Sequence, residues 1–338
     1  MDPVKNPIGQ YGEFNYIRRF KPNFDTLLTE SEVGIGDDCA VIPNGADSIL
    51  VTTDMLLEDI HFIRDAISPE ELGYKSLAVN LSDIAAMGGT PIGSFLSMAV
   101  PSNIEVSYLD GFMEGYYSLS AKYNVPLLGG DTTKSSDKIA INVGVLGKAK
   151  NNQIKYRKDA VVGDAICVTG PLGDSAAGLE AVLKHTENTN LIKSLKRKHH
   201  KPEPRVNEGM FLASMPEVHA MMDVSDGLAS DLKHILELSD VSAEVNVNTI
   251  PVSDEFKMAC KQYAWDYNKL LVGVGEDYEL LFTVEDNMFD ELNEDFHKKF
   301  GKNIFKIGNI IEGPQEVKWF NNHNLIDLKT KGFDHFNN

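Results

Sequence analysis

The chain is poor in positive charge. Its 338 residues include 32 Lys and Arg against 50 Asp and Glu, which gives a formal net charge of −18. Proteins that bind nucleic acids or anionic membranes need a basic face, so this balance argues against both kinds of partner. It does not oppose nucleotide binding, because bound divalent cations reverse the sign of a local site.

Cysteine and long apolar runs are also scarce. The three cysteines, Cys39, Cys167 and Cys260, are widely spaced and follow no CxxC pattern. Neither a disulfide framework nor a zinc site follows from them. No stretch approaches the length of a membrane span, and the N-terminal residues lack the apolar core of a secretory signal. We therefore expect a cytoplasmic protein.

The familiar nucleotide-binding and hydrolase motifs are missing. Gly147-Lys148 and Gly301-Lys302 lack the loop and the following Ser or Thr of a Walker A motif, and residues 273–277 lack the spacing of a dinucleotide loop. HExxH and GxSxG do not occur. If the protein binds ATP, it holds the phosphate groups with a different motif.

The order of predicted elements indicates a mixed α/β protein with two domains. Strand-like and helix-like segments alternate, and the polar break near residues 148–152 predicts a boundary between domains 1–150 and 151–338. Ser68, Pro69 and Glu71 form a capping box that predicts the start of a helix, which should end at Gly88-Gly89. Residues 185–205 are basic and predict a solvated loop or helix surface.

Seven aspartates in five short segments are the main chemical signal. The segments read GIGDDCA, VTTD, NLSDIAAMGG, LLGGDTT and MDVSDGL, and they contain Asp37, Asp38, Asp54, Asp83, Asp131, Asp223 and Asp226. Carboxylates repel one another when gathered, so a fold that gathers them needs cations, and hard oxygen ligands suit Mg²⁺ or Ca²⁺. Neighbouring glycines and a helix start suit phosphate. The combination predicts magnesium–nucleotide chemistry.

These segments, together with VTGPLGDSAAGL and GEDYEL, resemble the thiamine-monophosphate kinases, a family within the aminoimidazole ribonucleotide synthetase superfamily. The resemblance runs from about Gly34 to the C-terminal KGFDHF. It implies a homodimer in which mixed N-terminal sheets of two copies form a shared barrel, each followed by an α/β C-terminal domain.

The resemblance also implies roles for individual residues. The implied magnesium ligands are Asp38, Thr52, Thr53, Asp54, Asp83, Asp131, Asp223 and Asp226. Whether Asp37 also coordinates a metal ion stays open. Implied ATP contacts are Gly130, Asp131, Arg157 and Ser225, and implied thiamine monophosphate contacts are His61, Glu276 and Phe333.

The implied reaction transfers the γ-phosphoryl group of ATP to thiamine monophosphate, giving thiamine diphosphate. The acceptor oxygen is already anionic near neutral pH, so no general base is expected, and several Mg²⁺ ions would supply positioning and charge neutralisation. Two alternatives stay open: another ATP-dependent enzyme of the superfamily, and a non-catalytic Mg²⁺–nucleotide scaffold.

Overall fold

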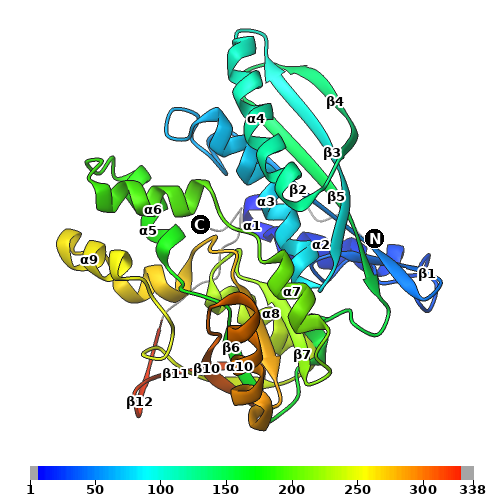
Figure 1. The fold of residues 1–338 in the computed structure, drawn as a ribbon, viewed down its shortest axis with the longest axis vertical. Coiled ribbons are helices and arrows are strands. Elements are labelled where there is room, and N and C mark those ends of the chain that lie inside the picture. Colours follow the sequence, from blue (N-terminus) through cyan, green and yellow to red (C-terminus); the bar gives the residue numbers. More distant parts are fainter. Residues whose placement is uncertain (1–6, 329–338) are drawn as a thin grey trace.

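The structure is a computed structural model that describes residues 7–328, and its chain builds two mixed sheets (Figure 1). The first sheet has the strand order β1-β2-β5-β3-β4. Its strands are β1 (Ala40–Asn44), β2 (Asp47–Leu57), β3 (Thr90–Pro101), β4 (Leu127–Ser135) and β5 (Ala140–Lys150). Neighbouring strands are antiparallel except β3 and β4.

The second sheet follows a connecting segment and has the order β12-β11-β8-β10-β6-β9-β7. Its strands are β6 (Ala165–Val168), β7 (Val218–Asp223), β8 (Ser242–Asn246), β9 (Leu280–Val284), β10 (Phe305–Ile311), β11 (Val317–Asn321) and β12 (Asn324–Ile326). Only the pairing of β11 with β8 is parallel within the described chain. The predicted mixed α/β architecture is confirmed.

The helices fill the space between and around the sheets. They are α1 (Ile8–Tyr11), α2 (Glu13–Asp25), α3 (Pro69–Ala86), α4 (Val106–Tyr123), α5 (Asp174–Leu183), α6 (Asn190–His200), α7 (Val206–Ala213), α8 (Leu228–Ser239), α9 (Asp254–Tyr263) and α10 (Phe289–Phe300). Short turns of other helix types are η1 (Arg157–Asp159), η2 (Lys269–Gly273) and η3 (Asp286–Met288). No helix in the described part is long and apolar enough to cross a membrane.

Helix α3 is the central element of the molecule. Its predicted capping box is confirmed, because the Ser68 hydroxyl accepts from the Glu71 N–H while the Glu71 carboxylate accepts from the Ser68 N–H. Most of the helix is buried. Its neighbour α4 lies so close that a Cβ on Gly73 would come within 1.9 Å of the Phe112 carbonyl oxygen. Such a tightly packed helix is a rigid support for the polar side chains near its C-terminal end.

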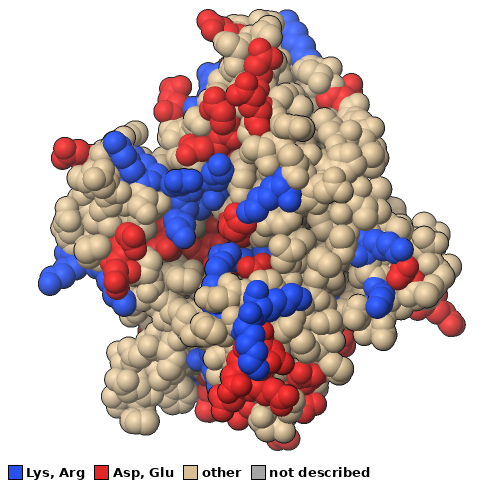
Figure 2. All heavy atoms as spheres, in the orientation of Figure 1, with Lys and Arg blue, Asp and Glu red and all other residues tan. Residues whose placement is uncertain are grey.

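No helix of residues 7–328 covers the opposite face of the first sheet. Helices α3 and α4 lie on one side of the strands, and the other side is bare in Figure 1. Met55 and Phe95 expose 59% and 42% of their surface there. Figure 2 shows few charged side chains over β3, β4 and β5. This face of the sheet is therefore exposed and largely uncharged.

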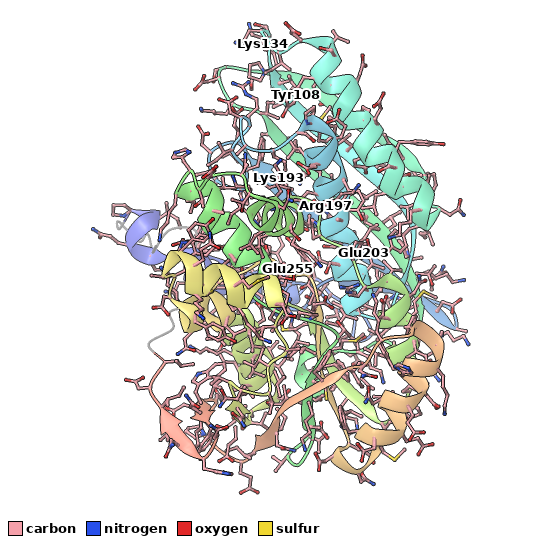
Figure 3. All side chains as sticks on the ribbon, turned by 60° about the vertical axis from the view of Figure 1, so that its left-hand side comes forward. Tyr108, Lys134, Lys193, Arg197, Glu203 and Glu255 are labelled. Atoms are coloured by element: carbon pink, nitrogen blue, oxygen red, sulfur yellow. The ribbon has the colours of Figure 1, made fainter. Side chains whose placement is uncertain are left out.

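The basic 185–205 segment is partly helical and firmly attached. Helix α6 buries His199 and His200 on one side, whereas Lys193 and Arg197 are exposed (Figure 3). Beyond its end, the Glu203 carboxylate accepts hydrogen bonds from the hydroxyls of two tyrosines and from a lysine, namely Tyr74, Tyr123 and Lys122. The segment is therefore anchored to α3 and α4.

Candidate functional site

Three of the predicted aspartates meet where the two sheets adjoin. Ligand oxygens of Asp38, Asp83 and Asp223 lie within 4.8 Å of one another. Asp38 precedes β1, Asp83 lies near the end of α3, and Asp223 ends β7. The first two belong to the N-terminal half and the third to the C-terminal half, so the cluster forms only when both halves are folded together.

The electrostatics of this cluster are unfavourable without a cation. Burial and, to a smaller extent, the charge of Asp38 raise the pKa of Asp223 to about 8. Burial also raises the pKa of Asp83 well above its ordinary value, and the neighbouring charges of Asp54 and Asp223 add to the shift. Buried carboxylates with raised pKa values and all-oxygen donors fit a hard divalent cation.

Strand β2 adds two more of the predicted ligands. The Thr52 hydroxyl donates a short hydrogen bond to Asp83. The Asp54 N–H donates to the Asn80 amide oxygen over 3.1 Å, which fixes β2 against α3. Burial, together with the charges of Asp38 and Asp226, raises the pKa of Asp54 to about 6. Asp54 is therefore electrostatically part of the cluster.

Arg157 forms a bidentate ion pair with Asp38. Its Nη2 lies 2.5 Å from Oδ1 and its Nε lies 3.2 Å from Oδ2. The Arg157 backbone N–H donates to Asp37 over 3.2 Å. Burial and the charge of the adjacent Asp38 raise the pKa of Asp37 to about 7. Arg157 lies in η1, so the segment that connects the sheets contacts the acidic cluster directly.

The turn that follows β7 is held by a buried carboxylate that the sequence did not single out. Asp231 accepts hydrogen bonds from the N–H groups of Ser225 and Asp226, at 3.1 and 3.3 Å. Asp231 is 1% exposed. The Tyr278 N–H donates to the Val224 carbonyl and the Val224 N–H donates to the Glu279 carbonyl, which ties this turn to the segment before β9. The feature of the sequence that could have indicated Asp231 is its position, five residues after Asp226 and in the first turn of the helix that follows, α8.

Two further unpredicted side chains orient the aspartates from α3. The Ser82 hydroxyl donates to Asp223 over 2.5 Å, and Asn80 holds Asp54 as described above. Both belong to the NLSD segment, whose polar residues follow helical spacing. Their motif was visible in the sequence, but their partners lie on other elements.

Thr53 and Asp131 lie on the opposite face of the first sheet from the cluster. The strand register places Asp131 beside Ser97, Ser97 beside Asn142, and Asn142 beside Met55. The Asn142 amide donates to the Thr53 hydroxyl over 2.9 Å. Since β4 and β2 are separated by two strands, Asp131 is roughly 14 Å from the strand that carries Asp54. Within one protomer, the structure does not bring Asp131 to the other acids.

Gly130 has a steric reason for its identity. A Cβ at this position would lie 1.7 Å from the Leu96 carbonyl oxygen, so only glycine allows β4 to approach β3 this closely.

The residues predicted to contact the substrate lie at different places in the fold. The Glu276 side chain lies at the junction of the two halves, where its charge helps to raise the pKa of Asp54. The His61 Nδ1 accepts from the Leu57 N–H over 3.0 Å, which fixes the ring just after β2. Phe333 lies outside the described residues.

Comparisons with known proteins place the chain in a family. Residues 36–149 match the family model "AIR synthase related protein, N-terminal domain", and residues 161–320 match its C-terminal counterpart. The thiamine-monophosphate kinase of Buchnera aphidicola (subspecies Acyrthosiphon pisum) is 41% identical over 335 residues, which cover 97% of this chain and 99% of that protein. The Bacillus subtilis enzyme of the same name is 38% identical, with 96% and 99% covered. The chain belongs to the thiamine-monophosphate kinase family.

Solved structures extend the comparison. The structure "AaThiL complexed with AMPPCP and TMP" superposes with a TM-score of 0.85 at 32% identity, covering 98% of this chain and all of that one. The thiamine-monophosphate kinase of Stenotrophomonas maltophilia gives a TM-score of 0.75 at 32% identity, covering 90% and 96%. The hydrogenase maturation protein HypE of Escherichia coli is 17% identical with a TM-score of 0.71, which shows the shared fold.

Proposed function

We propose that this protein phosphorylates thiamine monophosphate with ATP, giving thiamine diphosphate. The observation that carries the proposal is the buried cluster of Asp38, Asp83 and Asp223 at the junction of the two halves. A family member that shares this fold was solved as a complex with an ATP analogue and TMP. We place the two domains at residues 1–150 and 151–338, so both contribute to the site.

The acidic cluster suits Mg²⁺, because its donors are all oxygens and its carboxylates are buried close together. Asp38, Asp54, Asp83 and Asp223 would hold the metal, with Asp226 at the start of the following turn. When bound, Mg²⁺ supplies neutralisation of the charge on the phosphate groups. Thr52 and Ser82 orient two of the carboxylates by hydrogen bonds, so these acids are positioned before any ligand arrives.

The other binding residues follow from the family resemblance. ATP contacts are assigned to Gly130, Asp131, Arg157 and Ser225, whereas thiamine monophosphate contacts are assigned to His61, Glu276 and Phe333. Arg157 is always protonated and forms planar bidentate pairs, so the guanidinium that now binds Asp38 is also suited to a phosphate oxygen.

We further propose direct in-line transfer without a phosphoenzyme. The acceptor is a phosphate oxygen that already carries charge near neutral pH, so the protein needs to orient two phosphate groups rather than remove a proton. No general base is assigned for this reason. Incubation with radiolabelled ATP, followed by acid quenching, should leave no acid-stable label on the protein. An aspartyl-phosphate trapped in this way would refute direct transfer.

A homodimer accounts for the residues on the outer face of the first sheet. The Thr53 side chain points away from the aspartate cluster, Gly130 and Asp131 are far from the cluster of their own protomer, and all three lie on or beside an exposed apolar face. A second copy that covers this face would bury Met55 and Phe95. The barrel formed by two such sheets would bring Asp131 to the partner's site.

Mixed dimers test this arrangement. Asp131→Asn and Asp223→Asn are each expected to abolish activity in homodimers. If Asp131 acts across the interface, a mixture of the two variants that exchanges subunits regains up to about a quarter of wild-type activity per protomer, because one of the two sites in each mixed dimer is intact. No recovery, despite mixed dimers seen by native mass spectrometry, would contradict the assignment.

The decisive assay for the function is thiamine diphosphate formation from ATP and thiamine monophosphate, with and without Mg²⁺. We expect product only when all three are present. ATP hydrolysis that is independent of thiamine monophosphate, with no thiamine diphosphate formed, would exclude the proposed reaction.

A further inference from the structure

Glu276 is held by a buried lysine from the other half of the chain. The Lys75 Nζ lies 2.9 Å from the Glu276 Oε2, and the Lys75 side chain is only 1% exposed. Lys75 lies on α3, whereas Glu276 lies in the loop before β9. Because an ammonium group in such a place needs a counter-charge, the pair fixes Oε2 toward α3.

The surroundings of Oε2 are closed by α6. The His199 Nδ1 lies 3.3 Å from Oε2 and 3.0 Å from the Ser175 hydroxyl oxygen. His199 is buried, and burial lowers its pKa well below the ordinary value, so its ring is neutral. Oε2 is thus enclosed by protein groups from α3 and α6.

Oε1 is left with acceptor capacity. It accepts one hydrogen bond, at 3.3 Å, from the Tyr278 hydroxyl. A carboxylate oxygen can accept two hydrogen bonds, and the Glu276 side chain remains 30% exposed. Lys75 and His199 already contact Oε2, so Oε1 is the oxygen with capacity left for a ligand at the junction of the two halves.

The Lys75 charge also decides what kind of group Glu276 recognises. The ammonium and the carboxylate form a pair with no net charge, so Glu276 attracts a cationic ligand only weakly through charge alone. A hydrogen bond to a fixed lone pair depends on direction and on the presence of an N–H donor. Thiamine monophosphate offers such a donor in the 4′-amino group of its pyrimidine ring.

We propose that Lys75 is a positioning residue that holds Glu276 so that its Oε1 accepts a hydrogen bond from the 4′-amino group of the substrate. This inference rests on the proposed function, since it names the atom and the support that select the pyrimidine ring. His199 contributes by closing the other side of the carboxylate.

The test compares thiamine monophosphate with its analogue that carries a 4′-oxo group in place of the amino group. Wild-type protein should prefer the amino compound in kcat/KM by roughly 10- to 100-fold, because the oxo compound faces Oε1 with an acceptor. In Glu276→Gln, the ammonium of Lys75 orients the amide oxygen, so the amide NH₂ takes the place of Oε1. This variant should lose or reverse the preference.

Lys75→Met tests the positioning role. We expect KM for thiamine monophosphate to rise and the preference for the amino compound to shrink, while KM for ATP stays the same. The matched control is Lys155→Met, which removes another buried lysine whose Nζ donates to the backbone carbonyls of Met215 and Val218. The control should keep the wild-type preference, whatever its thermal stability.

The outcomes separate this inference from the proposed function. If wild-type protein forms no thiamine diphosphate, the proposed function is wrong. If it forms thiamine diphosphate but Glu276→Gln keeps the wild-type preference, the assignment of Oε1 is wrong. If Lys75→Met raises both KM values equally, its role is not positioning. Circular dichroism tests whether each variant is folded. If Lys75→Met is not folded, the result for Glu276→Gln alone decides.

Discussion

Replacing Asp223 by asparagine should stabilise the metal-free protein and at the same time remove its response to Mg²⁺. Burial and the charge of Asp38 raise the pKa of Asp223 from 3.8 to about 8. Because the folded-state pKa is the higher one, the carboxyl group lowers stability as the pH rises from about 4 to about 8. Below pH 4 this penalty is absent.

The size of the penalty at pH 7 follows from the shift. The pH then lies about three units above the unfolded-state pKa but below the folded-state pKa, and each unit corresponds to about 1.4 kcal/mol. The metal-free protein therefore carries a penalty of up to about 4 kcal/mol, shared with the other acids of the cluster. Asparagine cannot ionise and still accepts the Ser82 hydrogen bond, so part of this free energy is recovered.

Thermal unfolding with EDTA or with excess Mg²⁺ measures both effects. For the wild type, Mg²⁺ at a hundred times its dissociation constant should add about 2.7 kcal/mol. For Asp223→Asn, the melting temperature in EDTA should rise by several degrees and the Mg²⁺ response should largely vanish. Asp277→Asn is the matched control, because burial raises the pKa of Asp277 to about 7 away from the cluster. A full Mg²⁺ response in Asp223→Asn would refute the reasoning.

Three further substitutions test other parts of the structure. Arg205→Met leaves the buried Glu279 carboxylate without its ion pair and should cost about 3–5 kcal/mol of unfolding free energy in urea titrations; a loss below 1 kcal/mol would contradict the burial of the pair. Ser68→Ala removes the cap of α3 and should cost about 0.5–2 kcal/mol in the same assay, whereas Ser68→Asp should cost less. Asp231→Ala releases the turn at Ser225 and should weaken binding of a non-hydrolysable ATP analogue roughly tenfold in calorimetry, whereas Asp231→Asn keeps an acceptor oxygen and most of the affinity.

Local signals made much of the fold predictable. The cap at Ser68, the first helical residue Pro69 and the glycine pair after α3 are short-range features, and the helix follows them closely. The position of Asp223 at the end of a strand is likewise local, because a buried apolar run precedes it.

Features that depend on register or on distant partners were not predictable in this way. Asp131 lies within β4, and only the pairing of three strands shows which face it occupies. In a regular strand, Asp277 would face away from Glu276 and Glu279. The chain there is irregular, with a positive φ of 52° at Tyr278, and β9 begins only at Leu280.

The three acids of that segment illustrate why sequence alone stops short of the site. Asp277 accepts from the N–H groups of Gly173 and Ser175, Glu279 pairs with Arg205, and Glu276 pairs with Lys75. Each partner is distant in sequence, so the segment GEDYEL does not show which partner each of the three acids has. The same limit applies to Lys75, which looks like a surface lysine on a helix until α6 and the loop before β9 cover it.

The aspartate cluster shows how function and stability oppose each other in this fold. Asp38 already has a counter-charge in Arg157, but the raised pKa values of Asp83 and Asp223 show that one guanidinium does not balance the group. An apolar residue at either position would pack at the same junction without this penalty. Because the acids come from both halves of the chain, a cation that relieves their repulsion also stabilises the contact between the halves. Metal binding and closure of the site should therefore be coupled.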